Sequence, residues 1–227
     1  MILRLILILL IPFALCAQNN TDAQGKKQGD WQKEYANGNL RYEGKFKNDV
    51  PVGIFKHYTE RGKLKANLEY FNAGKSSSAR LYHPNGKLQA VGLYSQEQKD
   101  SLWRYYNEQE VLVSEETYRF GKLHGEVKSF YANGKVAERF RHIEGVRDGV
   151  WKQFYQDGEL KANCLYEEGV FNGRYTMYSP DGKKEYEGFY QKDLKEGVWK
   201  YFLPNGDLDY EVEYEKGRAL TELKFDD

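Results

Sequence analysis

The amino-acid sequence predicts an all-β protein: an elongated single array of tandem antiparallel β-hairpins, built from eight 24-residue units. Two observations support this fold class. Glycine recurs at a fixed phase with no insertion or deletion between copies, and aromatic side chains recur at fixed distances after it. The chain holds 22 glycines, 5 prolines and 15% aromatic residues, which supply the turns and strand formers that such hairpins need.

Each unit begins at a glycine or serine, which we number position zero. These residues are Gly29, Gly53, Ser77, Ser101, Gly125, Gly149, Gly173 and Gly197. Position two holds a ring or an apolar side chain, in the order Trp31, Phe55, Ala79, Trp103, Val127, Trp151, Tyr175 and Trp199. All four tryptophans of the chain occupy this position. We therefore expect Trp31, Trp103, Trp151 and Trp199 to form a structural core between stacked units.

The middle of each unit predicts a tight turn. A second glycine stands at position nine of seven units, and Asn or Asp precedes it in six of them, as in Asn37-Gly38. Such pairs accept the positive φ that hairpin turns require. After the turn, apolar and polar residues alternate, as at Leu160, Ala162 and Cys164, which is typical of a half-buried strand. A polar link then leads to the next unit.

Units three and four are the least regular part of the array. Ala79 replaces the ring at position two, Ser101 replaces a position-zero glycine, and Glu110 replaces a turn glycine. Relaxed constraint explains these exceptions, and a flexible or specificity-bearing middle is the alternative.

We expect four segments along the chain. Residues 1–17 form a signal peptide, 18–28 a flexible polar linker, 29–220 the eight hairpin repeats, and 221–227 a partial ninth unit that caps the sheet. Arg4, the eleven-residue apolar run from Leu5 to Leu15 and the small-residue site Cys16-Ala17 indicate the signal peptide. The protein is thus expected in the periplasm, in the cell envelope or outside the cell. Anchoring as a lipoprotein through Cys16 is less favoured, because a small residue usually stands where Leu15 does.

The repeat resembles the variant MORN repeats, and most of all those of the YwqK antitoxin family of bacterial proteins. Residues 149–160 and 197–206 carry the match, with the pattern Gly-Val-Trp-Lys, an aromatic residue and then Asp-Gly or Asn-Gly. The resemblance covers about residues 29 to 217. It implies a β-hairpin array that contacts proteins or membranes, and a toxin–antitoxin role. Export departs from that role, because an antitoxin outside the cytoplasm would need an exported toxin.

Composition and residue spacing favour no enzymatic chemistry. The formal net charge is zero, from 34 basic and 34 acidic residues, so we expect no nucleic-acid partner. The histidines at 57, 83, 124 and 142 have no Cys or His partner at metal-ligand spacing. Cys164 shares its position with apolar residues and is expected to be buried. We expect no catalytic residue, no metal and no cofactor.

A basic stripe beside a tyrosine row is the candidate partner-binding surface. The basic residues stand at position three and the rings at position five; they are Lys56, Arg80, Arg104, Lys128, Lys152 and Lys200, with Tyr58, Tyr82, Tyr106 and Tyr178. The stripe either holds an acidic protein or glycan, or pairs with Glu115, Glu187 and Glu211 on neighbouring strands.

Positions two and five cannot share one face of a regular strand. Either a bulge reorients the second ring, or the two rows lie on opposite faces. We expect an exported, non-enzymatic scaffold that binds a protein partner. The alternative is a module that binds an envelope carbohydrate or a lipid headgroup, since choline- and glucan-binding repeats also use Trp, Tyr and Asn-Gly in short hairpins.

Overall fold

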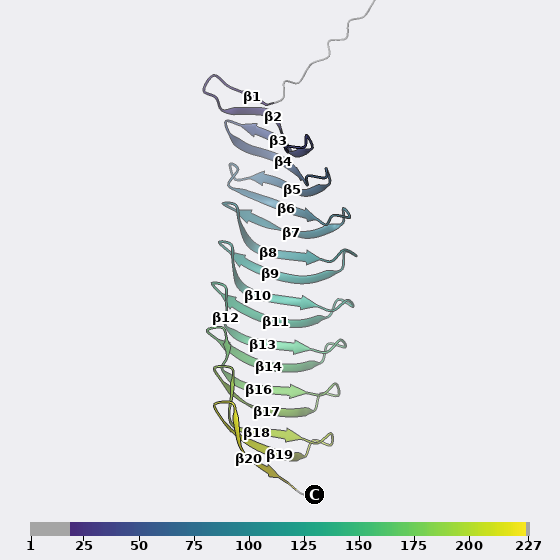
Figure 1. The fold of residues 1–227 in the computed structure, drawn as a ribbon, viewed down its shortest axis with the longest axis vertical. Helices are drawn as coiled ribbons and strands as arrows, with labels where there is room; N and C mark the ends of the chain where they lie inside the picture. Colours follow the sequence, from purple (N-terminus) through teal and green to yellow (C-terminus); the bar gives the residue numbers. More distant parts are fainter. Residues whose placement is uncertain (1–18, 226–227) are drawn as a thin grey trace, which may run out of the picture.

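The computed structural model describes residues 19–225, and all of its regular secondary structure is β-strand. The strands form one open antiparallel sheet, long and narrow, in which each rung follows the previous one along the chain (Figure 1). The predicted fold class is therefore confirmed. The expected signal peptide, including Cys16, lies outside the described residues. No described segment is a helix long and apolar enough to cross a membrane.

The strand bounds follow the 24-residue repeat. In chain order they are β1 (Asn20–Thr21), β2 (Lys27–Glu34), β3 (Leu40–Lys47), β4 (Val50–Tyr58), β5 (Leu64–Phe71), β6 (Ser76–Tyr82), β7 (Leu88–Ser95), β8 (Gln98–Tyr106), β9 (Leu112–Arg119), β10 (Lys122–Phe130), β11 (Val136–Ile143), β12 (Val146–Arg147), β13 (Gly149–Phe154), β14 (Leu160–Glu167), β15 (Val170–Phe171), β16 (Gly173–Tyr178), β17 (Lys184–Gln191), β18 (Leu194–Phe202), β19 (Leu208–Glu215) and β20 (Arg218–Lys224). β12 and β13 both pair with β11, and β15 and β16 both pair with β14, so each couple forms one interrupted rung.

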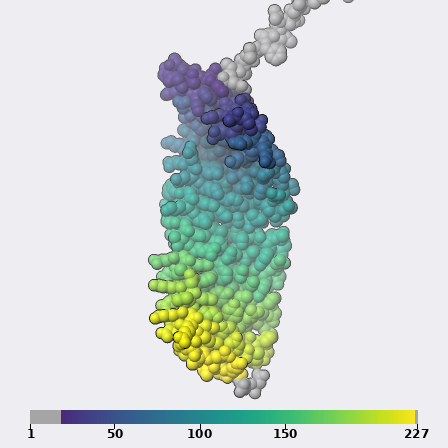
Figure 2. All heavy atoms as spheres, in the orientation of Figure 1, coloured from purple at the N-terminus to yellow at the C-terminus, as the bar shows by residue number. Residues whose placement is uncertain are grey.

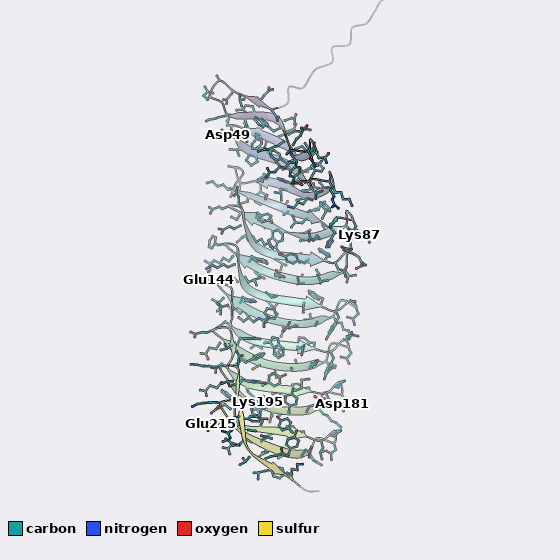
Figure 3. All side chains as sticks on the ribbon, in the orientation of Figure 1. Asp49, Lys87, Glu144, Asp181, Lys195 and Glu215 are labelled. Carbon is teal, nitrogen blue, oxygen red and sulfur yellow. The ribbon has the colours of Figure 1, made fainter. Side chains whose placement is uncertain are left out.

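Two kinds of turn alternate along the two long edges. On one edge lie the Asn/Asp-Gly turns, where Tyr35 N donates to Asn39 O and Gly38 has a φ of 82°. On the other edge lie two-residue turns such as Asn48–Asp49, with φ values of 53° and 68°, which match the twist of the flanking strands. The link that the sequence marked only as polar is therefore a second hairpin turn. Figure 3 labels Asp49 and Glu144 on this second edge, with Lys87 and Asp181 on the first.

Strand structure begins earlier than the sequence indicated. We expected residues 18–28 to be a flexible linker, but residues 20–21 and 27–28 are strand residues and pair with each other. The turn between them is held by Asp22, whose carboxylate accepts hydrogen bonds from the backbone amides of Gln24 and Lys26. At the other end, β20 lies along β19.

The two faces of the sheet differ in character. The aromatic face carries positions two and four of each outgoing strand and alternate residues of the returning strand. Its largest fully buried side chains are Trp103 and Trp199, each with 0% exposure. The charged face lies on the opposite side and carries positions one, three and five. Because the sheet is a single layer, the buried rings are covered by their neighbours on the same face.

Three glycines make room for rings on the aromatic face. A Cβ on Gly44, Gly92 or Gly188 would lie within 2.6 Å of the ring of Phe55, Trp103 or Trp199, respectively. The pairing between units is irregular at each of these three glycines. The ring of one unit thus lies directly on the backbone of the unit before it.

Candidate binding sites on the two faces of the sheet

Edge-to-face ring contacts connect the aromatic face along the array. Phe55 lies between Phe46 and Tyr70, with ring centroids 5.1 and 5.2 Å away. Trp103 meets Tyr94 at 4.9 Å, and Trp199 meets Tyr190 at 5.0 Å. Such contacts add to the free energy of burial. A position-two ring is therefore packed against the aromatic residue that ends the preceding returning strand.

Lysines cover several of these rings. Lys99 Nζ lies 4.9 Å from the ring centroid of Trp103, and Lys195 Nζ lies 4.2 Å from that of Trp199. Lys27 stands over Trp31 in the same way. Each lysine precedes its tryptophan by four residues. The pattern indicates a repeated cation–π contact that shields the core from water.

On the charged face, the basic stripe is largely paired. Glu43 illustrates this, because it lies 3.2 Å from Lys56 Nζ and accepts a hydrogen bond of 2.8 Å from Tyr58. The hydrogen bond from Tyr58 and then the Lys56 ammonium lower the pKa of Glu43. Burial and this same carboxylate raise the pKa of Tyr58 to about 12.

The other stripe residues have varied partners. Arg104 pairs with Glu115 and Lys200 with Glu211, as the pairing interpretation expected. Glu187 binds Arg174 and Lys184 instead, since it faces Thr176 within its hairpin, and Lys200 on its other side pairs with Glu211. Lys128 pairs with Glu126, two residues before it on the same strand. Arg80 and Lys152 have no ion pair within residues 19–225. The stripe is thus only in small part available to an acidic partner.

The two ring rows lie on opposite faces of the sheet. Tyr58 shares Glu43 with Lys56, whereas Phe55 packs against Phe46 and Tyr70 on the other side. The irregularity in each hairpin falls on the returning strand, as at Arg41, and leaves positions two to five of the outgoing strand regular. The position-five tyrosines are half-buried, and each is paired across the hairpin: Tyr58 with Leu64, Tyr82 with Leu88, Tyr106 with Leu112 and Tyr178 with Lys184.

The charged face also carries an exposed apolar ridge, formed by Val150, Leu165, Phe189 and Val198. Val150 is 52% exposed and Phe189 is 48% exposed. Val150 pairs directly with Leu165 across β13 and β14. Phe189 is paired with Arg174 on β16, the rung next to β14. These four side chains therefore line up across neighbouring strands of units six to eight.

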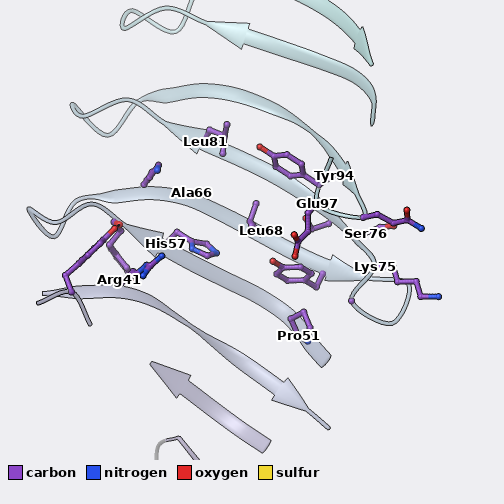
Figure 4. A pocket seen from close by; sticks show the side chains of 17 residues that line it. Arg41, Pro51, His57, Ala66, Leu68, Lys75, Ser76, Leu81, Tyr94 and Glu97 are labelled. Carbon is purple, nitrogen blue, oxygen red and sulfur yellow. The ribbon is translucent and has the colours of Figure 1, made fainter. Parts of the chain in front are cut away.

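On the aromatic face a hollow of about 860 Å³ opens where the ring row is interrupted. Ala79 stands at position two here, and Ala66, Leu68 and Leu81 line the hollow together with Tyr70 and Tyr94. Figure 4 shows these strands with Arg41 and His57 at one end and Lys75 and Glu97 toward the other. Lys65 also lines it. Its size falls within the range of small-molecule sites.

His57 is a polar group in this apolar surrounding. Its Nε2 is buried and has no hydrogen-bond partner. Burial, followed by the nearby Lys65 and Arg41 charges, lowers its pKa. The imidazole is therefore neutral at neutral pH, and the charges at this end of the hollow come from Arg41 and Lys65.

Other reactive groups are packed away from solvent. Cys164 is buried, and burial raises the pKa of its thiol to about 11. His142 is also buried and lies against the Phe140 ring, 5.3 Å between centroids. Within residues 19–225 no three His, Cys, Asp or Glu side chains are grouped so as to hold a metal ion.

Sequence reasoning named neither the hollow nor the ridge. In the sequence, Ala79 is an exception to the ring row. The structural effect of Ala79 depends on which rings pack around position two, and the sequence repeat alone does not show which rings these are. Val150 and Val198 look like ordinary strand residues in the sequence, because their exposure follows from the single-layer architecture.

Comparison with known protein families identifies the repeat. The model of the MORN repeat variant matches seven segments that together make up more than half of the chain: 27–48, 51–72, 78–96, 123–141, 147–168, 171–192 and 195–216. The chain belongs to the MORN repeat variant family. The unmatched stretch between the third and fourth segments contains Ser101 and Glu110, the residues that depart most from the repeat. This match concerns the repeat, and the finer YwqK assignment stays a prediction.

Solved structures add only distant likenesses. The chain is 10% identical to a chain of a mutant S. aureus TarM, in complex with fondaparinux, α-GlcNAc-glycerol and UDP, with a TM-score of 0.33 over 53% of this chain and 21% of that one. It is 12% identical to TcdB2-TccC3, with a TM-score of 0.24; the match covers 90% of this chain and 14% of that one. It is 12% identical to the Photorhabdus luminescens Tc holotoxin pore with a mutated TccC3, with a TM-score of 0.20; the match covers 80% of this chain and 12% of that one. The chain thus corresponds to about a fifth or less of these proteins, and the TM-scores carry no argument. No curated protein sequence matches it.

Proposed function

We propose that this MORN-variant repeat protein is an exported, non-enzymatic scaffold that binds a protein partner along its charged face. The apolar ridge of Val150, Leu165, Phe189 and Val198 carries the proposal. Large exposed apolar side chains that gather on one part of a protein surface mark sites of association. A partner that covers the ridge would remove these side chains from water and gain about 25 cal/mol for each Å² buried.

The surroundings of the ridge favour a protein over a glycan or lipid headgroup. Arg174 lies between Leu165 and Phe189, with Glu187 bound to it, so both signs of charge flank the apolar residues. An apolar centre with a mixed polar rim is the usual composition of a protein–protein interface. Export rests on the sequence of residues 1–17, and an antitoxin-like role would be one form of this binding function.

Co-purification from the native host tests the proposal. The full chain is compared with the double variant Phe189→Ser/Val198→Ser, and with Ile54→Ser as a matched control. Ile54 occupies position one like Val198 and is 56% exposed, but it lies in unit two, far from the ridge. We expect a partner that the wild type and the Ile54→Ser variant retain equally, and that the ridge variant retains at least tenfold less.

Three results would contradict the proposal. Equal retention by the ridge variant would place the partner elsewhere. Retention on cell-wall material that free sugar competes away would favour the carbohydrate alternative. Catalytic turnover of any co-purified molecule would overturn the non-enzymatic role.

A further inference from the structure

The hollow on the aromatic face has the form of a position left without its ring. In units two, four and eight, the position-two ring fits against the aromatic residue that ends the preceding returning strand. In unit three the same place is bordered by Tyr70 before it and Tyr94 after it, and both line the hollow. Ala79 supplies no ring, and no ring contact connects Tyr70 to Tyr94 within residues 19–225. The aromatic network is therefore interrupted where the hollow lies.

The cation that accompanies a ring in other units is also present. Lys75 precedes Ala79 by four residues, as Lys99 precedes Trp103 and Lys195 precedes Trp199. Lys75 lines the hollow and has neither an ion pair nor a ring contact among the described residues. An aromatic guest would meet two tyrosine rings and a nearby lysine, which are the partners that the protein's own tryptophans have.

Charge at one end of the hollow selects an acidic guest. Arg41 and Lys65 line this end, beside the neutral His57. No ion pair engages either cation in residues 19–225, and the carboxylate in the lining is that of Glu97, whose charge contributes to the raised pKa of Tyr70. A guest carboxylate would thus find two cations without an ion-pair partner at the edge of an apolar cleft, where ionic contacts are stronger than in open water.

We propose that the hollow binds a short protein segment that inserts an aromatic side chain between Tyr70 and Tyr94 and places an acidic side chain against Arg41 and Lys65. The inference shares the protein-binding character of the proposed function, but it uses the opposite face of the sheet and different residues. The two faces would allow the scaffold to hold two partners, or two parts of one partner.

A peptide titration with the full chain tests this site. The probe is acetyl-Glu-Trp-Glu-Gly amide, and binding is followed by calorimetry and by the NMR signals of the His57 ring. Acetyl-Glu-Leu-Glu-Gly amide and acetyl-Lys-Trp-Lys-Gly amide are control peptides. We expect the first peptide to shift the His57 signals and to bind at least tenfold more tightly than either control. Its affinity should fall as salt is raised, because the ionic contacts are screened.

Two kinds of variant locate the binding. Leu68→Gly/Ala79→Trp copies the Gly92–Trp103 arrangement of the next unit and should fill the hollow. If it does not fold, Ala66→Tyr serves instead, since tyrosine occupies the equivalent position at Tyr42, Tyr186 and Tyr210. Either plug should weaken peptide binding at least tenfold. Arg41→Gln/Lys65→Gln should weaken it at least fivefold. Lys161→Gln, at the position of unit six that matches Lys65, should leave it unchanged.

The outcomes separate this site from the proposed function. Equal binding to wild type and plug variant, or absence of binding to wild type, would overturn the inference even if the ridge captures a partner. Saturable binding lost in the plug variant would support it even if the ridge captures none. Displacement of the peptide by glucuronate at a lower concentration than the peptide itself would assign the hollow to acidic saccharides and overturn the choice of a protein segment.

Discussion

The contact between Gly92 and Trp103 allows a quantitative test of how the units are held together. A Cβ on Gly92 would lie 2.2 Å from the Trp103 ring, well inside the van der Waals distance. The tryptophan is fully buried, and its Nε1 donates a hydrogen bond of 3.0 Å to Leu93 O. A small outward shift cannot accommodate the added methyl group, because Tyr94, Tyr105 and Lys99 surround the indole.

We expect Gly92→Ala to lower the free energy of unfolding by about 3 kcal/mol. Forcing an extra methyl into a packed core costs about 1–3 kcal/mol. Displacing the indole also weakens its ring contact with Tyr94, about 0.5–1.5 kcal/mol, and its hydrogen bond, about 1 kcal/mol. Against these costs, the substitution would stabilise the backbone of the strand by up to about 1 kcal/mol, since alanine is more favourable than glycine in a strand.

A double-mutant cycle in urea measures this coupling. Trp103→Ala alone should cost about 3–5 kcal/mol. In that background Gly92→Ala should cost nothing, or should stabilise slightly, because the ring it would collide with is gone. Unfolding is followed by near-ultraviolet circular dichroism, which reports on the packed rings. A Gly92→Ala variant as stable as the wild type would refute the reasoning, and so would a cost that persists without Trp103.

Three further predictions follow from single residues. Ser101 has a φ of 59°, unlike Ser77, the other position-zero serine. Ser101→Gly should therefore raise the free energy of unfolding, measured in urea, by about 0.5–1 kcal/mol, whereas Ser77→Gly should lower it. The opposite pair of effects would contradict the argument that Ser101 is strained. The folded pKa of Tyr58 is raised to about 12 from 10.0 by burial and by Glu43, so its contribution to stability is complete below pH 10 and is lost as pH rises through 12. Tyr58→Phe should flatten the stability profile in this window, and an unchanged slope would argue against it. Cys164, with its pKa raised to about 11 by burial, should react with a thiol reagent at neutral pH only as fast as the chain opens, whereas immediate labelling of the native protein would contradict its burial.

The repeat made most of the fold readable from the sequence. Position-zero glycines have positive φ within the first half of the outgoing strand, as at Gly29 and Gly53, and the Asn-Gly pairs form the turns. The second turn was not recognised, because its residues vary from Asn48–Asp49 to Phe120–Gly121. These pairs share a backbone conformation with positive φ, not a residue type. The turn is therefore recognised in the structure, where it recurs along one edge of the sheet, and not in the sequence.

The binding surfaces were harder to predict, because they depend on neighbours in the next unit. The sequence left open whether a bulge turns the position-five rings toward the tryptophans. In the structure these rings and the basic stripe share the opposite face, where Glu43 of the preceding hairpin pairs with Lys56. Likewise, Leu68 lines a hollow together with Tyr70 and Tyr94, because Ala79, its partner across β5 and β6, supplies no ring to cover it. Periodicity gives the place of each residue, whereas the free volume and unpaired charge around it come from packing between units.

Because the sheet is built from local connections, its length can change by whole repeats. Each rung pairs only with rungs adjacent along the chain, and Figure 2 shows the sequence colours following one another down the molecule as bands. Deleting or duplicating 24 residues between equivalent positions would therefore rejoin matching strands, and would change the molecule by two strand spacings, about 10 Å. The number of repeats would therefore set the distance between a molecule bound near one end of the sheet and a molecule bound near the other end.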